Sequence, residues 1–363
     1  MQQFEEDFLI LKFARVGLSP VLKKFIFDAY PGEEESDLEK RIEIADAIAK
    51  KVGATIPNDI DLEKEIAYHL RYGVKIIGIH HKCYPQTLRQ IPSAPVALSV
   101  KGQAYALMRL KASIAGTREP DVLDFGIIRE IVYWINKSGF IVVSGLAIGT
   151  DSVAHLESME EGTIGIIGCG ISQNYPCDNE FFVKKIIEKG GCIVSEYAYK
   201  EPPRASNFIQ RDRLIAGIAT SVFIMRARAC RCGTMATARF AKSFGRKIYT
   251  VDFQHDCVGN KYLLNSGAAE KIIDFEQVRA DLVMDLFNFK NNFEKEEEFV
   301  LQNQLFDTKI DTKNVKKEIK KWLKNSNYQS INENNFLKIY ELCKNDIGAS
   351  DLEVRMGILE EMI

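Results

Sequence analysis

Glycine- and hydroxyl-rich turns recur in the middle of the sequence, each directly after a short apolar run. Glycine lets the backbone approach a phosphate closely, and exposed N–H groups at the start of a helix attract negative charge. Arg118, in the first turn, adds a planar guanidinium that suits a phosphate. Together the turns predict phosphate binding. They are Gly116-Thr117-Arg118, Ser144-Gly145-Leu146-Ala147, Gly168-Cys169-Gly170 and Cys232-Gly233-Thr234.

An aromatic residue stands among arginines in residues 202–213, where a double proline predicts an extended approach to a helix. Arginines that hold phosphates and an aromatic ring that stacks on a base are the two components of single-strand binding. The alternative is that Phe208 belongs to the core and that the arginines are solvated. The pattern alone favours neither interpretation. The arginines are Arg204, Arg211 and Arg213.

Charge is divided unevenly in this part of the chain, although the formal net charge of the whole chain is only −2. Residues 119–180 contain two basic and ten acidic residues, whereas residues 181–250 contain fourteen Lys and Arg against four acids. A split of this size predicts a basic face for a polyanion. The alternative is a solvated surface with compensating acids nearby.

Residues that would support catalysis or metal binding are sparse. Neither the GxGxxG fingerprint nor the Walker GxxxxGK[ST] pattern occurs, which disfavours a nicotinamide or nucleoside-triphosphate enzyme. His155 has no nucleophile spaced to partner it, and Glu196 has no evident acid partner. We interpret the eight cysteines as free thiols because they form no CxxC pair, despite the metal-like grouping of Cys230, Cys232 and residues 255–257. We therefore predict no catalytic residue, no metal and no cofactor.

Short apolar runs that alternate with helical stretches must position these residues. This alternation indicates a parallel sheet covered on both faces. We predict an α/β protein with a Rossmann-like, doubly wound, mostly parallel sheet, which would bring the turns to one edge. The predicted strands are residues 112–115, 141–144, 164–167, 193–195, 221–225 and 248–251, and the predicted helices are residues 123–137, 152–161, 179–188, 211–218 and 234–243.

The segments on either side of the predicted sheet are helical in pattern. We predict a small helical domain in residues 1–75, the extended Rossmann-like domain in residues 76–280, a charged linker in residues 281–325 and a small helical domain in residues 326–363. No run approaches the ~20 apolar residues that cross a bilayer. The N-terminus does not have the pattern of a signal peptide, so we expect a cytoplasmic protein without a membrane partner.

The order of these motifs resembles the DprA/Smf family, DNA-processing protein A. The resemblance covers roughly residues 80–275. It lies in residues 113–118, 142–155, 168–176, 195–196, 203–217 and 233–238, with a lead-in at 84–102 and a close at 259–268. It implies a homodimeric, non-enzymatic protein of natural transformation. Such a protein binds and protects incoming single-stranded DNA and helps to load the recombinase RecA. It also implies a SAM or helix-hairpin-helix domain before the sheet and a winged-helix domain after it.

The resemblance also implies which residues face DNA. By motif position they are Arg118, Arg204, Phe208, Arg211, Arg213, Gly233 and Thr234, with Ser144 and Gly145 as backbone contacts. Three features depart from the family pattern. Asp212 replaces the usual Asn and would bring a negative charge near phosphate. Cys232 begins a turn that is usually Ser-Gly-Ser, and the C-terminal domain stops at Ile363, where a wing is expected.

Two other functions remain open on the sequence. A nucleotide N-glycosidase of the lysine-decarboxylase-like type also uses a Rossmann-like sheet, and Arg231-Cys232-Gly233-Thr234 superficially resembles its PGGxGTxxE motif. The leading glycines and the catalytic Glu of that motif are missing here. A regulatory sensor could bind a nucleotide in the same turns.

Overall fold

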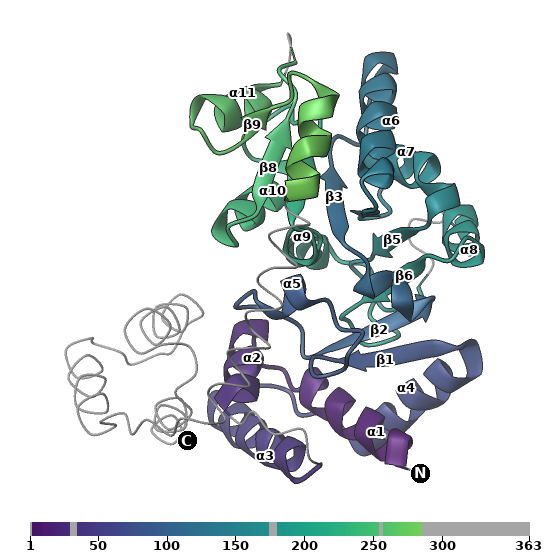
Figure 1. Cartoon of the computed structure of the whole chain (residues 1–363). Coiled ribbons are helices and arrows are strands. Elements are labelled where there is room, and N and C mark those ends of the chain that lie inside the picture. Colours follow the sequence, from purple (N-terminus) through teal and green to yellow (C-terminus); the bar gives the residue numbers. More distant parts are fainter. Residues whose placement is uncertain (1, 30–34, 174–179, 254–256, 285–363) are drawn as a thin grey trace, which may run out of the picture.

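The computed structural model describes residues 2–29, 35–173, 180–253 and 257–284. Its strands form a nine-stranded sheet in the order β1-β2-β6-β5-β4-β3-β7-β8-β9 (Figure 1). The neighbours from β6 to β9 are parallel, whereas β1 and β2 are antiparallel additions at one edge. The strands are β1 Val74–Gly78, β2 Ala97–Gly102, β3 Lys111–Ala115, β4 Ile141–Ser144, β5 Thr163–Ile166, β6 Cys192–Ser195, β7 Ser221–Ile224, β8 Lys247–Thr250 and β9 Glu270–Lys271. The predicted doubly wound, mostly parallel sheet is confirmed.

Helices cover both faces of the sheet. They are α1 Gln2–Arg15, α2 Pro20–Ala29, α3 Glu35–Val52, α4 Asp59–Tyr72, α5 Gln86–Arg89, α6 Val122–Lys137, α7 Thr150–Glu157, α8 Glu180–Glu188, α9 Ala205–Ile218, α10 Gly233–Ser243 and α11 Val258–Asn265, with short 3₁₀ turns at Ala104–Met108 and Met159–Glu161. Neighbouring residues of β4 show why the strand has consecutive apolar residues. Val142 shares a buried cluster with Ile131 of α6, whereas Val143 shares one with Leu214 of α9 on the other face.

The N-terminal helices pack against the antiparallel edge of the sheet (Figure 1). Their core includes Phe13 and Phe25 together with Ile76 of β1 and Ala97 of β2. Helix α4 ends at Tyr72, and β1 begins two residues later at Val74. We did not predict β1, because its short run is interrupted by a lysine and becomes a strand only by pairing with β2.

Helix α9 is longer than predicted. It begins at Ala205 rather than at residue 211, directly after the N-cap position Arg204. The prediction that Phe208 lies just before the helix was therefore wrong, whereas Arg204 at its N-cap is extended. The proline pair ends two residues before the helix, and residues 205–210 contain no glycine or proline to interrupt it. Phe208 and Arg211 consequently lie one turn apart on the same helix.

Two further predictions concern the rest of the chain. None of the helices within the described residues is long and apolar enough to span a membrane. The predicted linker at 281–325 and terminal domain at 326–363 lie outside the described residues, apart from residues 281–284.

Candidate nucleic-acid interface

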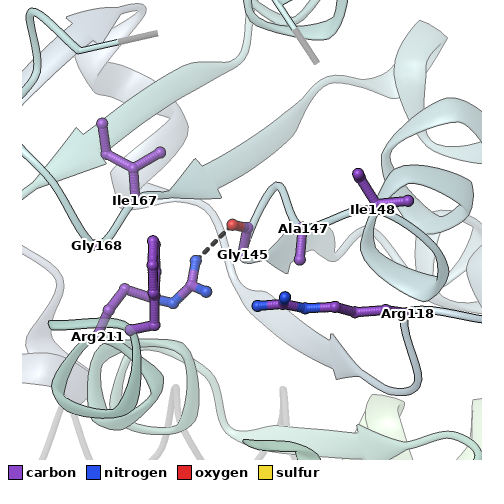
Figure 2. Close-up of a pocket in the computed structure, with 8 residues that line it drawn as sticks. Arg118, Gly145, Ala147, Ile148, Ile167, Gly168 and Arg211 are labelled. Carbon is purple, nitrogen blue, oxygen red and sulfur yellow. Dashed lines mark hydrogen bonds between the residues drawn. The ribbon is translucent and has the colours of Figure 1, made fainter. Parts of the chain in front are cut away.

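A pocket lies at the carboxyl ends of β3, β4 and β5, next to α9 (Figure 2). This is the edge where ligands bind in open α/β sheets, and the strand order reverses beside β3. The pocket therefore brings together the first three predicted turns and the aromatic–arginine segment. It is lined by Arg118, Gly145, Ala147, Ile148, Ile167, Gly168, Phe208 and Arg211.

Arg118 is the exposed cation of the pocket. Its side chain extends along the pocket toward Arg211, and it forms no ion pair within the described residues (Figure 2). The loop beneath it is fixed, since the Thr150 amide and hydroxyl both donate to the Thr117 carbonyl, at 3.0 and 2.9 Å. Gly149 adopts a φ of 93°, and a Cβ there would come within 2.5 Å of the Arg118 backbone. The loop thus presents a free guanidinium from a rigid base.

Arg211, in contrast, is buried and its donors are occupied. Its guanidinium donates to the carbonyls of Gly145 and Ile166, and its Nε lies 3.2 Å from the Asp212 carboxylate. These bonds join α9 to the ends of β4 and β5. Arg211 therefore holds the walls of the pocket together in this structure.

Asp151 fixes the turn after β4. Its Oδ2 accepts hydrogen bonds from the amides of Gly145 and Ala147, at 3.0 and 3.2 Å, and burial raises the pKa of this carboxyl. Between them, Leu146 takes a left-handed φ of 56° and buries its side chain. The Ser144 hydroxyl donates to the Ile114 carbonyl at 2.6 Å and is fully buried. At the two residues expected to contact DNA through the backbone, the Ser144 hydroxyl and the Gly145 amide thus already donate hydrogen bonds within the protein.

Phe208 is half-buried and forms the aromatic wall of the pocket. It packs on Gly168, where a Cβ would lie 2.7 Å from the phenylalanine ring. Arg204 is exposed near the start of the same helix and lies 3.3 Å from the Glu201 carboxylate. The Arg211 guanidinium lies 6.0 Å from the centroid of the Phe208 ring. The ring is thus partly packed within the protein while it lines the pocket, which the sequence pattern left undecided.

Arg213 does not line the pocket. Its guanidinium is buried and forms an ion pair with Glu196, the carboxylate considered in the sequence as a catalytic group without an acid partner. Residues two apart on a helix point in different directions, which separates Arg213 from Arg211.

The start of α10 lies close to Asp212. Gly233 is exposed, and its side-chain position is 4.0 Å from the Asp212 carboxylate. Burial raises the pKa of Asp212 to about 6, while the neighbouring Arg211 opposes this shift. Thr234 follows at the first turn of α10, where Cys232 occupies the N-cap position without a capping side-chain bond. The helix thus begins with amide donors beside a carboxyl whose pKa is raised.

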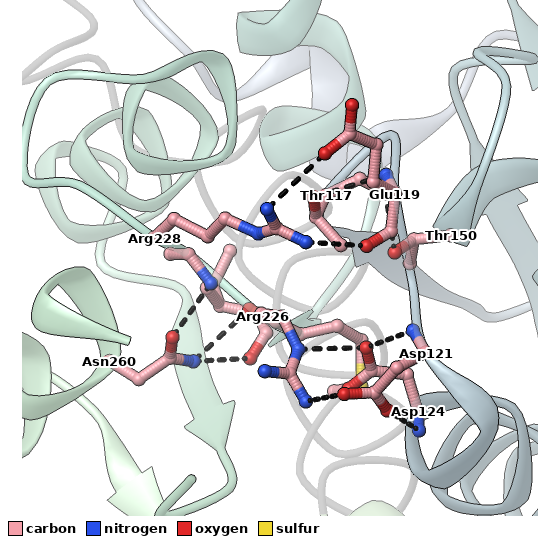
Figure 3. Close-up of polar contacts among 11 residues, drawn as sticks. Thr117, Glu119, Asp121, Asp124, Thr150, Arg226, Arg228 and Asn260 are labelled. Carbon is pink, nitrogen blue, oxygen red and sulfur yellow. Dashed lines mark hydrogen bonds and ion pairs between the residues drawn. The ribbon is translucent and has the colours of Figure 1, made fainter. Parts of the chain in front are cut away.

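Part of the uneven charge is balanced by ion pairs around the loops after β3 and β7 (Figure 3). Arg226 contacts Asp124 at 2.8 Å and Asp121 at 2.6 Å, and Arg228 contacts Glu119 at 3.2 Å. Acids of the first half therefore pair with arginines of the second half. These segments are distant in sequence, but their strands, β3 and β7, are neighbours. Arg231 and Arg239 are exposed and form no ion pair among the described residues, so the basic face stays a prediction.

The candidate catalytic and metal residues have structural surroundings. His155 is fully buried, and burial lowers its pKa to about 3 while its Nδ1 lies 2.9 Å from the Thr163 hydroxyl. In the part of the chain that the structure describes, no three His, Cys, Asp or Glu side chains form a metal-binding group. Sequence reasoning missed the role of Asp151, whose position at the start of a helix after a glycine turn was the available signal.

The sheet, its two helical layers and the pocket at its carboxyl edge define a Rossmann-like α/β protein whose candidate site suits a phosphate-bearing ligand. A model of one family, DNA recombination-mediator protein A, matches residues 75–283. The chain belongs to this family.

Several characterised proteins are similar to this chain. Protein Smf of Synechocystis sp. is 34% identical over 217 residues, which are 55% of this chain and 52% of that protein. DNA processing protein DprA of Bacillus subtilis is 29% identical over 206 residues, 54% of this chain and 69% of that protein. The chain therefore spans about half the length of the Synechocystis relative.

Two solved structures share the fold. DNA processing protein A of Streptococcus pneumoniae aligns with a TM-score of 0.54 at 24% identity, over 76% of this chain and 92% of that one. DNA processing protein A of Helicobacter pylori, whose structure concerns its single-stranded DNA binding mode, aligns with a TM-score of 0.52 at 27% identity, over 55% of this chain and 93% of that one.

Proposed function

We propose that this protein binds single-stranded DNA at the carboxyl edge of its sheet. One observation carries the proposal. An exposed, unpaired guanidinium (Arg118) and a half-buried aromatic ring (Phe208) line the same pocket. A guanidinium suits a backbone phosphate, and an aromatic face stacks on a base of any sequence.

Other predicted residues take different parts in this proposal. Arg204 and the amides of Gly233 and Thr234 bind neighbouring phosphates, because they are accessible at helix starts on the same edge. Arg211 is a positioning residue, since its bonds hold the walls of the pocket. Ser144, Gly145 and Arg213 support the site through their hydrogen bonds and ion pair within the protein.

We further propose that the protein acts as a recombination mediator in natural transformation. In this role it protects incoming strands, helps to load a RecA-type recombinase and works as a homodimer without catalysing a reaction. Membership of the recombination-mediator family and the similarity to the Helicobacter pylori protein support this. Incubation with nucleoside monophosphates tests the competing nucleotide N-glycosidase. Sustained release of free base would overturn the non-enzymatic proposal.

The binding proposal is tested by fluorescence anisotropy with a labelled single strand. Arg118→Ala and Phe208→Ala should each weaken binding about 10-fold or more, the size expected when one phosphate contact or one stacked base is lost. Arg129→Ala and Phe4→Ala are matched controls, because they change an exposed arginine on α6 and an exposed phenylalanine on α1. Unchanged binding by both pocket variants, or equal affinity of the wild type for a blunt duplex, would refute the proposed site.

A further inference from the structure

Three tyrosines form an aromatic cluster where α4 meets the loop after β6. The ring centroids of Tyr68 and Tyr72 are 4.5 Å apart, and those of Tyr68 and Tyr199 are 4.9 Å apart. Tyr68 and Tyr199 are half-buried over a core cluster of the sheet, whereas Tyr72 is 49% exposed. This tyrosine cluster thus joins the N-terminal helices to the sheet and keeps an open aromatic edge.

Two cations flank the tyrosine cluster. The Arg71 guanidinium lies 5.5 Å from the Tyr72 ring centroid, and the Lys200 ammonium lies 5.2 Å from that of Tyr199. Both side chains are exposed, and neither forms an ion pair within the described ranges. The neighbouring acids have other partners, since Asp61 pairs with Lys64 and Glu201 with Arg204. The positive charge beside the rings is therefore available to an anion.

The loop after β5 links the tyrosine cluster to the pocket. Gly170 packs so closely on Tyr199 that a Cβ would lie 2.3 Å from the tyrosine carbonyl oxygen, and the Ser172 amide donates to that oxygen at 3.0 Å. Two residues before Gly170, Gly168 lines the pocket beneath Phe208. One short loop therefore contacts both the pocket and the cluster.

We propose that the tyrosine cluster, with Arg71 and Lys200, binds a second stretch of the same DNA single strand that occupies the pocket. This inference rests on the proposed function. Stacked aromatic faces beside free cations match the alternating bases and phosphates of a single strand. A cluster that only joined the two parts of the chain would not need unpaired cations beside its rings. The N-terminal helices thereby lengthen the binding surface.

The test compares two labelled oligothymidylates, of about 6 and about 20 nucleotides, in anisotropy titrations of the full chain. The wild type should bind the longer strand more tightly. Tyr72→Ala and Lys200→Glu should each weaken binding of the longer strand about 10-fold, because a stacked base or a phosphate contact is lost, and should leave binding of the shorter strand unchanged. Lys200→Glu should unfold at the wild-type temperature, since its side chain is exposed. Tyr72→Ala should lose about 1 kcal/mol of stability, because its ring packs on Tyr68, and should still be folded at the temperature of the titration.

Matched controls lie on α6. Tyr133 is also 49% exposed, with Lys137 5.6 Å from its ring centroid. Tyr133→Ala and Lys137→Glu repeat the same chemistry at the opposite end of the strands, and should bind both lengths as the wild type does. Wild-type binding of the longer strand by Tyr72→Ala and Lys200→Glu would overturn the inference, as would an equal loss on both lengths. Failure of the wild type to bind either strand would instead refute the proposed function.

Discussion

At the scale of the residue, the two arginines of the pocket differ in their contacts within the protein. Arg118 is exposed without an ion pair in the described chain, whereas Arg211 is bonded to two carbonyls and a carboxylate. Both were predicted as DNA contacts from one motif pattern. Their surroundings give them different expected effects on stability.

Arg211→Ala should destabilise the fold, because it leaves buried Asp212 without its ion-pair partner and Asp151 without the favourable charge nearby. The expected loss is about 3–5 kcal/mol of unfolding free energy. Arg118→Ala should stay within about 0.5 kcal/mol of the wild type, as surface changes do. Urea unfolding followed by circular dichroism measures both. Equal losses for the two variants would contradict the assignment of separate roles.

Asp212 should make DNA binding depend on pH. Burial raises the pKa of this carboxyl to about 6, so that it is mostly charged at pH 7.5 and mostly neutral at pH 5. Its negative charge lies near the proposed phosphate position at the start of α10. Affinity for a single strand should therefore rise several-fold as pH falls through about 6. Asp212→Asn should bind tightly throughout and lose this dependence, and a persisting dependence in that variant would assign the titration to another group.

At the scale of the element, ion pairs hold the loops that carry the site. Arg226, in the loop after β7, bonds to the capping box formed by Asp121 and Asp124 at the start of α6 (Figure 3). Asn260 of α11 fixes the same loop through the Ala227 amide at 2.7 Å. The loop that presents Arg118 is thus tied to the loop that leads to α10.

Arg226→Ala should loosen the Arg118 loop, because buried Asp124 loses its partner. We expect about 3 kcal/mol less stability and weaker DNA binding. Hydrogen exchange of residues 116–124 should become faster. Arg228→Ala is the control, since its ion pair with Glu119 is exposed and should contribute about 0–1 kcal/mol. Unchanged exchange in Arg226→Ala would show that the loop is held by other contacts.

At the scale of the whole molecule, the N-terminal helices are firmly joined to the sheet. Arg15 of α1 pairs with Glu65 of α4 at 2.6 Å and also donates to the Glu196 carbonyl at 2.9 Å. Glu196 in turn pairs with Arg213 of α9. A buried charge network therefore links the first helix to the helix that carries Phe208.

The pairing of charges across the molecule limits how many phosphates one molecule engages. Five arginines of residues 181–250 have carboxylate partners. The proposed contacts use four cations, namely Arg118, Arg204, Arg71 and Lys200. The log–log dependence of single-strand affinity on salt should therefore have a slope of about −3. Titrations at several NaCl concentrations measure it. A slope of about −6 would mean that the ion pairs open when DNA binds.

The sequence by itself determined the sheet and its edge. Apolar runs are a local property of the sequence, so the pattern alone predicts the parallel strands and the glycine turns at their ends. The turns around Arg118 and Gly168 line one pocket, as predicted. The tertiary structure alone decided which charges are free. Arg226 and Asp124 are 102 residues apart and become partners only because β3 and β7 are neighbours. The burial of Asp212 and the contact between Tyr68 and Tyr199 also depend on which elements pack together. Local periodicity determines which residues face a core, but the charge and accessibility of a site depend on residues that strand order brings together.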